Sequence, residues 1–307
     1  MKLRPNFLIV GMERSGSLWT SATLNEHPDI ASFPSLPFKV LSNPEDQRIG
    51  EMHFFNMIAS LEPNMEGKFT RDLSGYTVKY GKVFADLISY AKKVPKEKFY
   101  KMMLKRYSEL CDKQRGNKKI VGESTPAYVF HLDFIDSLYP GRNMKKICSI
   151  REPKDKITSR HFSLLGRGIK KENKITEEFA MEYVHTRIVK EYEALLAYNG
   201  SIHCVTYEKR HRKPNEVVRS ILDYLKIEAT DETIDKMILN ASFEEMTKRD
   251  LKETVGRVSG DGDMKESMRK GVVGDWENNM DKRLAGAIDA VVLPIREEVF
   301  KKYDLEV

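Results

Sequence analysis

The sequence contains few cysteines. Its three cysteines, Cys111, Cys148 and Cys204, are widely separated in 307 residues and follow no metal-ligand spacing. Two of them stand in apolar runs typical of strands, so we interpret all three as reduced packing residues. The sequence therefore predicts neither a disulfide-stapled fold nor a cysteine-based metal site.

The sequence also lacks long apolar runs. None approaches the roughly 18 apolar residues of a membrane span, and the amino terminus turns polar after one short apolar run, unlike a secretory signal. The sequence therefore predicts a cytoplasmic protein with no membrane partner.

A strong excess of one charge is absent as well. Fifty-two basic against 46 acidic residues give a net charge of +6 that is spread along the chain. This balance suits a small anionic ligand better than nucleic acid, which we do not expect as a partner. Basic clusters such as Lys209-Arg210-His211-Arg212 are most simply solvated charge on loops and helix faces.

What the chain does contain is an alternation of short apolar runs and long helical stretches. The runs lack strict alternation, which is typical of buried parallel strands; they are Asn6–Val10, Lys119–Gly122, Lys145–Ile150 and Ser201–Thr206. The helical stretches repeat apolar residues every three or four positions; they include Glu97–Lys113, Glu177–Tyr198, Pro214–Leu225 and Lys282–Tyr303. With no repeat or linker, the pattern predicts an α/β fold in which residues 1–307 form a single three-layer domain, a central parallel sheet flanked by helices.

The first motif joins a strand to a helix. Gly11–Trp19 (GMERSGSLW) opens the helical pattern Gly16–Glu26, and free N–H groups at such a helix start favour phosphate. The two glycines have the spacing of a nucleotide-triphosphate P-loop, but Ser17 stands where that loop needs lysine. The cation is instead Arg14, inside the loop, which weakens an interpretation as a kinase.

This segment resembles the 5'-phosphosulfate loop of sulfotransferases that use 3'-phosphoadenosine-5'-phosphosulfate (PAPS). Arg14 replaces the family's lysine, and Leu18 replaces its second hydroxyl residue. Arginine can bind phosphate and sulfate oxygens bidentately, but with a pKa above ~12 it cannot readily act as an acid. The resemblance implies a P-loop-like cofactor loop made of Arg14, Ser15, Gly16, Ser17 and Leu18, with Trp19 stacking on the adenine.

Two further segments resemble the same family. Arg151-Glu-Pro-Lys-Asp155-Lys-Ile-Thr-Ser159 follows a predicted strand and matches the family's Arg-x-Pro-x-Asp-x-x-x-Ser, which implies that Arg151 and Ser159 bind the 3'-phosphate. Residues 269–278 (RKGVVGDWEN) match the Arg-Lys-Gly-x-x-Gly-Asp-Trp-x-Asn signature, the most specific match in the chain. It implies that Arg269, Lys270 and Gly271 close over the 3'-phosphate. Residues 250–273, rich in Gly, Asp, Lys and Ser, are predicted to form a mobile loop over the cofactor.

The candidate base lies downstream of the first motif. Gly50–Phe55 (GEMHFF) resembles the Lys-Glu-x-His-Phe-Phe segment of the heparan-sulfate sulfotransferases, whose glutamate is the base. Gly122–Tyr128 (GESTPAY) resembles a second segment of that branch, with Ser124 in place of a lysine. The resemblance implies Glu51 as base, His53 as a further participant and Glu123 as the fallback. Glu51 as a helix-start charge and His53 as a packed residue stay open alternatives.

The resemblance as a whole implies a PAPS-dependent sulfotransferase with PAP as product and no metal. It would transfer a sulfuryl group to a hydroxyl or amine of a small-molecule or glycan acceptor, with Arg14 and Glu51 in the catalytic machinery. A P-loop kinase of a small metabolite and a non-catalytic PAPS- or PAP-binding family member are the alternatives. The sequence leaves the acceptor and the oligomeric state open.

Overall fold

The fold is known from a computed structural model. It describes residues 5–33, 53–59, 62, 93–142, 144–166, 168–248 and 270–306. Glu51, Arg269 and most of the predicted loop 250–273 lie outside the described residues.

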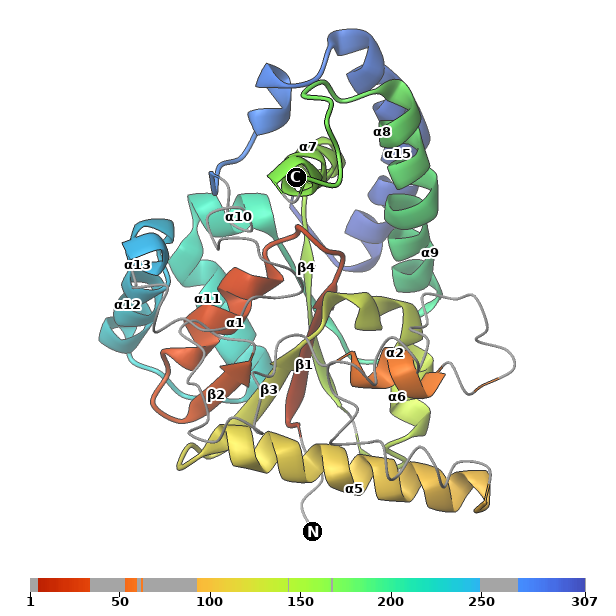
Figure 1. Ribbon diagram of the computed structural model, residues 1–307. Helices are drawn as coiled ribbons and strands as arrows, with labels where there is room; N and C mark the ends of the chain where they lie inside the picture. The colour runs from red at the N-terminus through yellow and green to blue at the C-terminus, as the bar shows by residue number, and fades with distance from the viewer. Residues whose placement is uncertain are drawn as a thin grey trace.

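Five parallel strands form the centre of the fold (Figure 1). Their order is β2-β3-β1-β4-β5. In chain order they are β1 (Phe7–Gly11), β2 (Ile30–Phe33), β3 (Ile120–Ser124), β4 (Lys145–Ile150) and β5 (His203–Thr206). Four of them coincide with predicted runs, and β2 was not predicted. The parallel sheet predicted from the sequence is thereby confirmed.

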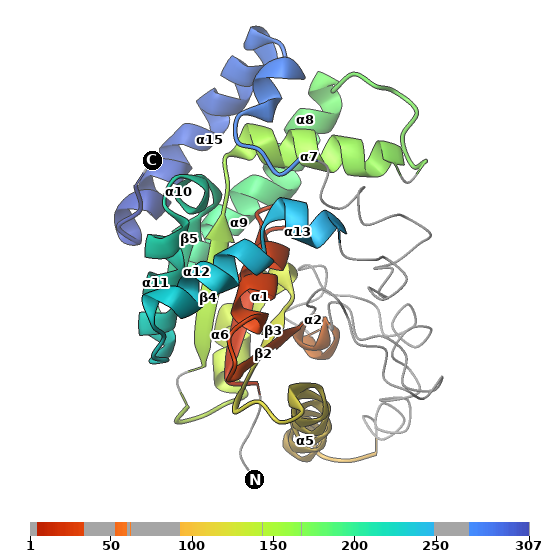
Figure 2. The ribbon, with the colours of Figure 1, turned by 90° about the vertical axis from the view of Figure 1, so that its left-hand side faces the viewer.

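Both faces of the sheet are buried. Side chains alternate between the faces along β1, so Leu8 and Val10 join one apolar cluster while Phe7 and Ile9 join another. The second cluster packs under helices that lie in front of the sheet in Figure 2: α1 (Ser17–Asn25), α11 (Pro214–Leu225) and α12 (Asp231–Asn240). The first cluster packs under α5 (Lys96–Arg115), α6 (Leu132–Ser137), α9 (Val189–Ala197) and α15 (Lys282–Lys302). These are the three predicted layers.

Further elements connect and cap these layers. They are α2 (Phe54–Ala59), η2 (Pro126–His131), α7 (Pro153–Gly166), α8 (Glu177–Tyr183), α10 (Tyr207–Arg212), α13 (Phe243–Lys248) and η4 (Asp275–Asn278). In Figure 1 the strands run upward, so α7 and η4 lie above the carboxyl ends of the sheet.

One predicted helix is interrupted. The continuous helix predicted over Glu177–Tyr198 is divided into α8 and α9 by a π-helical turn at Val184–Ile188. Ala180, Val184, Ile188 and Tyr192 are all buried and recur every four residues, more than the 3.6 residues of an α-helical turn. The wider π turn corrects the resulting drift and keeps these side chains on one face.

The strand order places a crevice beside β1. This strand pairs with β3 on one side and with β4 on the other, and the chain leaves β1 toward β2 but leaves β4 toward β5. Ligands of open α/β sheets bind at such a reversal, beyond the carboxyl ends of the strands. The loop after β1 and Arg151 after β4 border this crevice.

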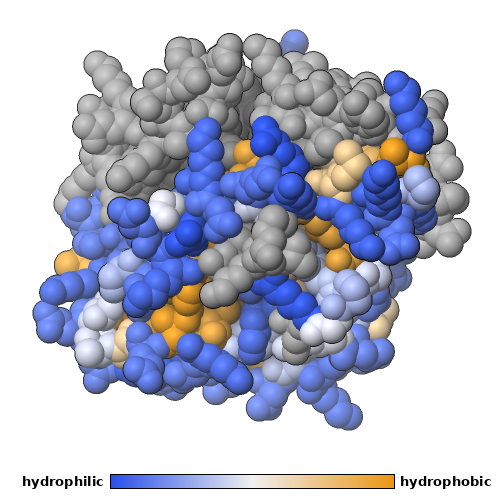
Figure 3. Space-filling view, turned by 90° about the horizontal axis from the view of Figure 1, so that it is seen from below, coloured by the Kyte–Doolittle hydropathy of each residue, from blue (hydrophilic) through white to orange (hydrophobic). Residues whose placement is uncertain are grey.

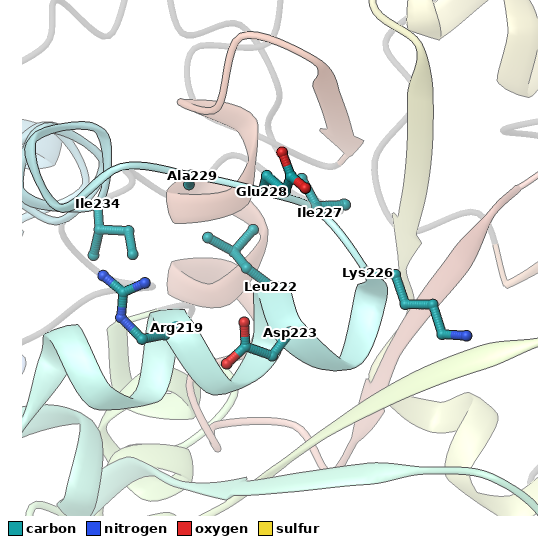
Figure 4. Close-up of a pocket in the computed structure, with 8 residues that line it drawn as sticks. All are labelled: Arg219, Leu222, Asp223, Lys226, Ile227, Glu228, Ala229 and Ile234. Carbon is teal, nitrogen blue, oxygen red and sulfur yellow. The ribbon is translucent and has the colours of Figure 1, made fainter.

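Seen from below, the described part of the surface is mainly hydrophilic, with separate hydrophobic areas (Figure 3). An open pocket of about 420 Å3 lies beside α11 (Figure 4), but none of the predicted site residues lines it. In the described ranges no helix combines the length and apolar character needed to cross a membrane.

The contact between β1 and β3 makes a prediction about stability. Gly122 lies opposite Phe7, and a Cβ built on it would be 2.0 Å from the ring of Phe7. Gly122→Ala should therefore destabilise the protein by about 1–3 kcal/mol through overpacking, measured by denaturant unfolding. Gly286→Ala, in α15, is the control, because a Cβ built on Gly286 meets no atom within 4 Å. Equal stability of the two variants would contradict the packing argument.

Candidate active site

The loop after β1 forms a cradle for an anion. Gly16 precedes α1 with φ 91°, and Arg14 also has a positive φ of 70°. These conformations turn the chain so that the first N–H groups of α1 are free to bind a negative group. Ser15 is buried, and its Oγ has no hydrogen-bond partner among the described residues. A buried hydroxyl without a partner favours a ligand at this position.

Arg14 and Arg151 join the first two motifs. The Nε of Arg14 donates to Ser159 Oγ at 2.9 Å, and an Nη of Arg151 donates to the carbonyl oxygen of Arg14 at 3.2 Å. The structure thus brings together residues from the loop after β1, the end of β4 and the second turn of α7. Their predicted roles in binding a nucleotide stay predictions.

Arg151 and Asp155 join the third motif to the second. The other Nη of Arg151 donates to the carbonyl oxygen of Val272 at 3.0 Å. The buried carboxylate of Asp155 accepts from the N–H groups of Gly274 and Trp276, at 2.8 and 3.1 Å. All three motifs therefore meet above the crevice.

The third motif is also held by contacts between its own residues and with side chains of α7 and α13. Lys270 Nζ donates to Asp275 Oδ1 at 2.9 Å, a contact between two residues of the motif. The Nζ of Lys154 lies over the ring of Trp276, 4.5 Å from the ring centroid. Gly271 lies against Phe243 of α13, since a Cβ on Gly271 would be 2.8 Å from that ring. Arg269, the first residue of the motif, is outside the described residues.

Positive charge around Arg151 is only partly balanced. Its nearest carboxylate is that of Asp155 at 3.6 Å, and this carboxylate already accepts two backbone N–H groups. The Nε of Arg151 has no partner in the described part of the chain, although the side chain is only 10% exposed. A buried guanidinium with an unused donor is expected where an anion binds.

Two residues of α10, Tyr207 and Arg210, belong to the site, although neither was predicted to be a site residue. The guanidinium carbons of Arg151 and Arg210 both lie 4.0 Å from the ring centroid of Tyr207. Arg210 also lies over Trp19, at 4.4 Å. The interpretation of this basic cluster as solvated charge is therefore wrong for Arg210, which is half-buried among rings. Its position in the first turn of the helix that follows β5 was the available signal.

The neighbours of Trp19 bear on its predicted stacking on adenine. One partner of the indole is the guanidinium of Arg210, and Trp19 also packs against the apolar cluster that contains Ala22 and Ala241. An adenine that contacts Trp19 would therefore also meet Arg210. The contact with adenine stays a prediction.

The two segments that resemble the heparan-sulfate branch dock on each other. The N–H of His53 donates to Thr125 Oγ1 at 3.3 Å, and the N–H of Phe54 donates to the hydroxyl of Tyr128 at 2.8 Å. Phe54 stacks on Tyr107 with ring centroids 4.1 Å apart. His53 is buried, with a positive φ of 48°. Glu51, just before it, lies outside the described residues.

Glu123, the fallback base, is fully buried at the end of β3. It accepts hydrogen bonds from the hydroxyls of Tyr107, at 3.0 Å, and Thr125. Burial, with a smaller contribution from the Glu123 carboxylate, raises the pKa of Tyr107 well above its ordinary value. These contacts favour Glu123 as a support of the segment around His53, since Thr125 bonds to both.

A buried ion pair lies near the loop after β1. Lys156 of α7 and Glu191 of α9 are both fully buried and form a salt bridge. Burial raises the pKa of Glu191, while Lys156 and the N–H of Met12 in the loop favour its charged form. The pair therefore joins the two helices close to Met12.

Removing one member of this pair should leave a buried charge without a partner. Glu191→Gln is expected to destabilise the protein by about 3–5 kcal/mol, whereas Lys156→Met combined with Glu191→Leu should regain most of that loss. Denaturant unfolding measures both. Glu97→Gln is the control, because its salt bridge with Lys101 is exposed. A double variant no more stable than Glu191→Gln would contradict this account.

Known proteins resemble this chain over different lengths. The sulfotransferase domain family matches residues 4–303. Sulfotransferase 1C2 from Rattus norvegicus is 32% identical over 75 residues, 24% of this chain and 25% of the rat protein. The human protein of the same name is 31% identical over 75 residues. The chain thus spans about a quarter of the length of these curated relatives.

Solved structures are similar in fold. Retinol dehydratase in complex with androsterone and inactive cofactor PAP has a TM-score of 0.51 at 17% identity, covering 100% of this chain and 84% of that chain. Mouse sulfotransferase SULT7A1 complexed with PAP has a TM-score of 0.52 at 16% identity, covering 98% and 85%. Identities this low support the fold alone. Because the family match extends over nearly the whole chain, the chain belongs to the sulfotransferase family, as its three motifs predict.

Proposed function

We propose that this protein is a sulfotransferase that uses PAPS and releases PAP. The observation that carries the proposal is the meeting of three distant motifs at one end of the sheet, around the partly unbalanced charge of Arg151. Family membership supports it.

The described residues fit a nucleotide with two anionic ends. Ser15 Oγ and Arg151 Nε are buried donors without an acceptor among the described residues, and oxygens of phosphate groups would satisfy both. The 5'-phosphosulfate would lie in the cradle formed by Arg14, Ser15, Gly16, Ser17 and Leu18. The 3'-phosphate would lie near Arg151, Ser159, Lys270 and Gly271, with Arg269 as a further candidate. The proposal needs no metal, because the charge comes from side chains and N–H groups.

The chain's contribution to the chemistry is positioning, charge stabilisation and proton removal. PAPS supplies an activated sulfuryl group, whose bond to the phosphate oxygen breaks as the acceptor oxygen or nitrogen bonds to sulfur. Arg14 would stabilise the charge that develops on the departing phosphate without donating a proton. Glu51 would take the acceptor's proton, with His53 beside it. The docking of Phe54 on Tyr128 supports this assignment by fixing the backbone near Glu51.

For the acceptor we propose a small molecule with a hydroxyl or amine. The similar structure of retinol dehydratase contains androsterone, a small molecule. A glycan stays the alternative, since two segments resemble the heparan-sulfate branch. That branch assignment is still a prediction.

Binding of PAP separates this proposal from the kinase alternative. Calorimetry should show that PAP binds and that Arg151→Ala and Lys270→Ala each weaken it about 10- to 100-fold, the effect of losing a charged hydrogen bond. Lys105→Ala, on the exposed side of α5, should bind PAP like the wild type. Strong binding of ATP with magnesium, without binding of PAP, would establish the kinase instead.

Turnover tests the base and the non-catalytic alternative. Glu51→Gln should lower kcat about 10²- to 10⁴-fold and leave PAP affinity unchanged, because only proton removal is lost. The assay follows labelled sulfate from PAPS to a panel of phenols, alcohols and amines. Glu62→Gln is the control, since Glu62 bonds to Lys96 and Tyr100. Full activity of Glu51→Gln would refute its role, and PAP binding without any sulfated product would favour a non-catalytic protein.

A further inference from the structure

Arg210 lies at the centre of a stack of cations and rings beside the phosphate-binding loop. Its guanidinium carbon is 4.4 Å from the ring centroid of Trp19 and 4.0 Å from that of Tyr207. A Cβ built on Gly16 would be 2.4 Å from an Nη of Arg210 and 2.8 Å from the Tyr207 ring. The guanidinium is therefore in contact with the start of α1.

The ring of Tyr207 contacts both Arg210 and Arg151. Each guanidinium carbon lies 4.0 Å from the ring centroid, so one side chain holds two arginines beside the same site. Ring contacts hold a guanidinium through its flat surface and leave the N–H donors at its rim available. Tyr207 thus presents two arginines in fixed positions, which reduces the entropy lost when they bind a ligand.

The charge of Arg210 has no ion-pair partner in the described part of the chain. Its hydrogen bonds to other residues are long, 3.4 Å to the carbonyl oxygen of Gly16 and 3.3 Å to His211 Nε2. The nearby carboxylate of Glu208 accepts from the N–H of Glu152 at 2.9 Å. Burial, followed by the charge of Arg151, lowers the pKa of Arg210 to about 10, so it stays charged at neutral pH.

We propose that Arg210 is a further nucleotide-binding residue, which donates to a phosphate group of the bound nucleotide from its position against Tyr207 and Trp19. A phosphate there would balance a charge that the described residues leave unpaired, and the rim of a guanidinium matches phosphate oxygens bidentately. The inference rests on the proposed function and deepens it. The group that Arg210 binds is either the 5'-phosphate or the 3'-phosphate, and binding of the two adenosine monophosphates distinguishes them.

The test is calorimetry with four ligands: PAP, adenosine 3'-phosphate, adenosine 5'-phosphate and adenosine. Arg210→Gln should weaken PAP about 10- to 100-fold. It should lower, by a similar factor, the affinity for the monophosphate whose phosphate Arg210 binds. The affinities for the other monophosphate and for adenosine should be unchanged. Arg212→Gln is the matched control on α10, because Arg212 is exposed, and it should bind PAP within about twofold of the wild type.

A second variant separates charge from packing. Arg210→Lys keeps the charge and should retain more PAP affinity than Arg210→Gln, whereas a residue that only packs against Trp19 and Tyr207 would show no such rescue. Thermal unfolding of each variant shows whether it is folded. Arg210→Gln with PAP affinity within twofold of the wild type would overturn the inference, as would equal losses for all four ligands. A wild type that binds none of the nucleotides would instead overturn the proposed function itself.

Discussion

Asp155 is the residue on which the geometry of the site depends most. It is buried in the first turn of α7 and accepts the N–H groups of Gly274 and Trp276. It also lies 3.6 Å from the guanidinium of Arg151. One carboxylate therefore holds the third motif in place and orients the arginine of the second. Because a buried carboxylate must have its oxygens satisfied, the position of the third motif is set by this requirement.

Among the described residues, two groups of buried or half-buried charges differ in how well they are balanced. Lys156 forms a salt bridge with Glu191, and Lys146 forms one with Asp136. Both pairs lie away from the edge of the crevice or beneath it. Arg151 and Arg210 lie at the crevice and stack on Tyr207. The carboxylates close to them do not fully balance their positive charge. Paired charges are explained by the folded chain alone. Unbalanced ones at a strand reversal are explained best by a ligand that brings the missing charge.

The prediction of the fold succeeded where the signal was local. Lys145–Ile150 is apolar and ends at a Pro-containing helix start, and β4 has these bounds. β2 was missed because Ile30–Phe33 is only four residues long and follows α1 after a short turn. The π turn at Val184–Ile188 was missed because apolar residues every four positions also fit an ordinary helix over a few turns.

For the site, the sequence by itself determined the three motifs and their order, because each consists of neighbouring residues whose spacing suits a phosphate. Only the tertiary structure decided that Arg14 bonds to Ser159, that Asp155 holds Gly274, and that Arg210 stacks on Tyr207 and Trp19. Apart from the contact between Arg210 and Tyr207 within α10, these contacts join residues far apart in the chain. They exist because parallel strands bring the ends of β1, β4 and β5 to one edge, which no local pattern specifies.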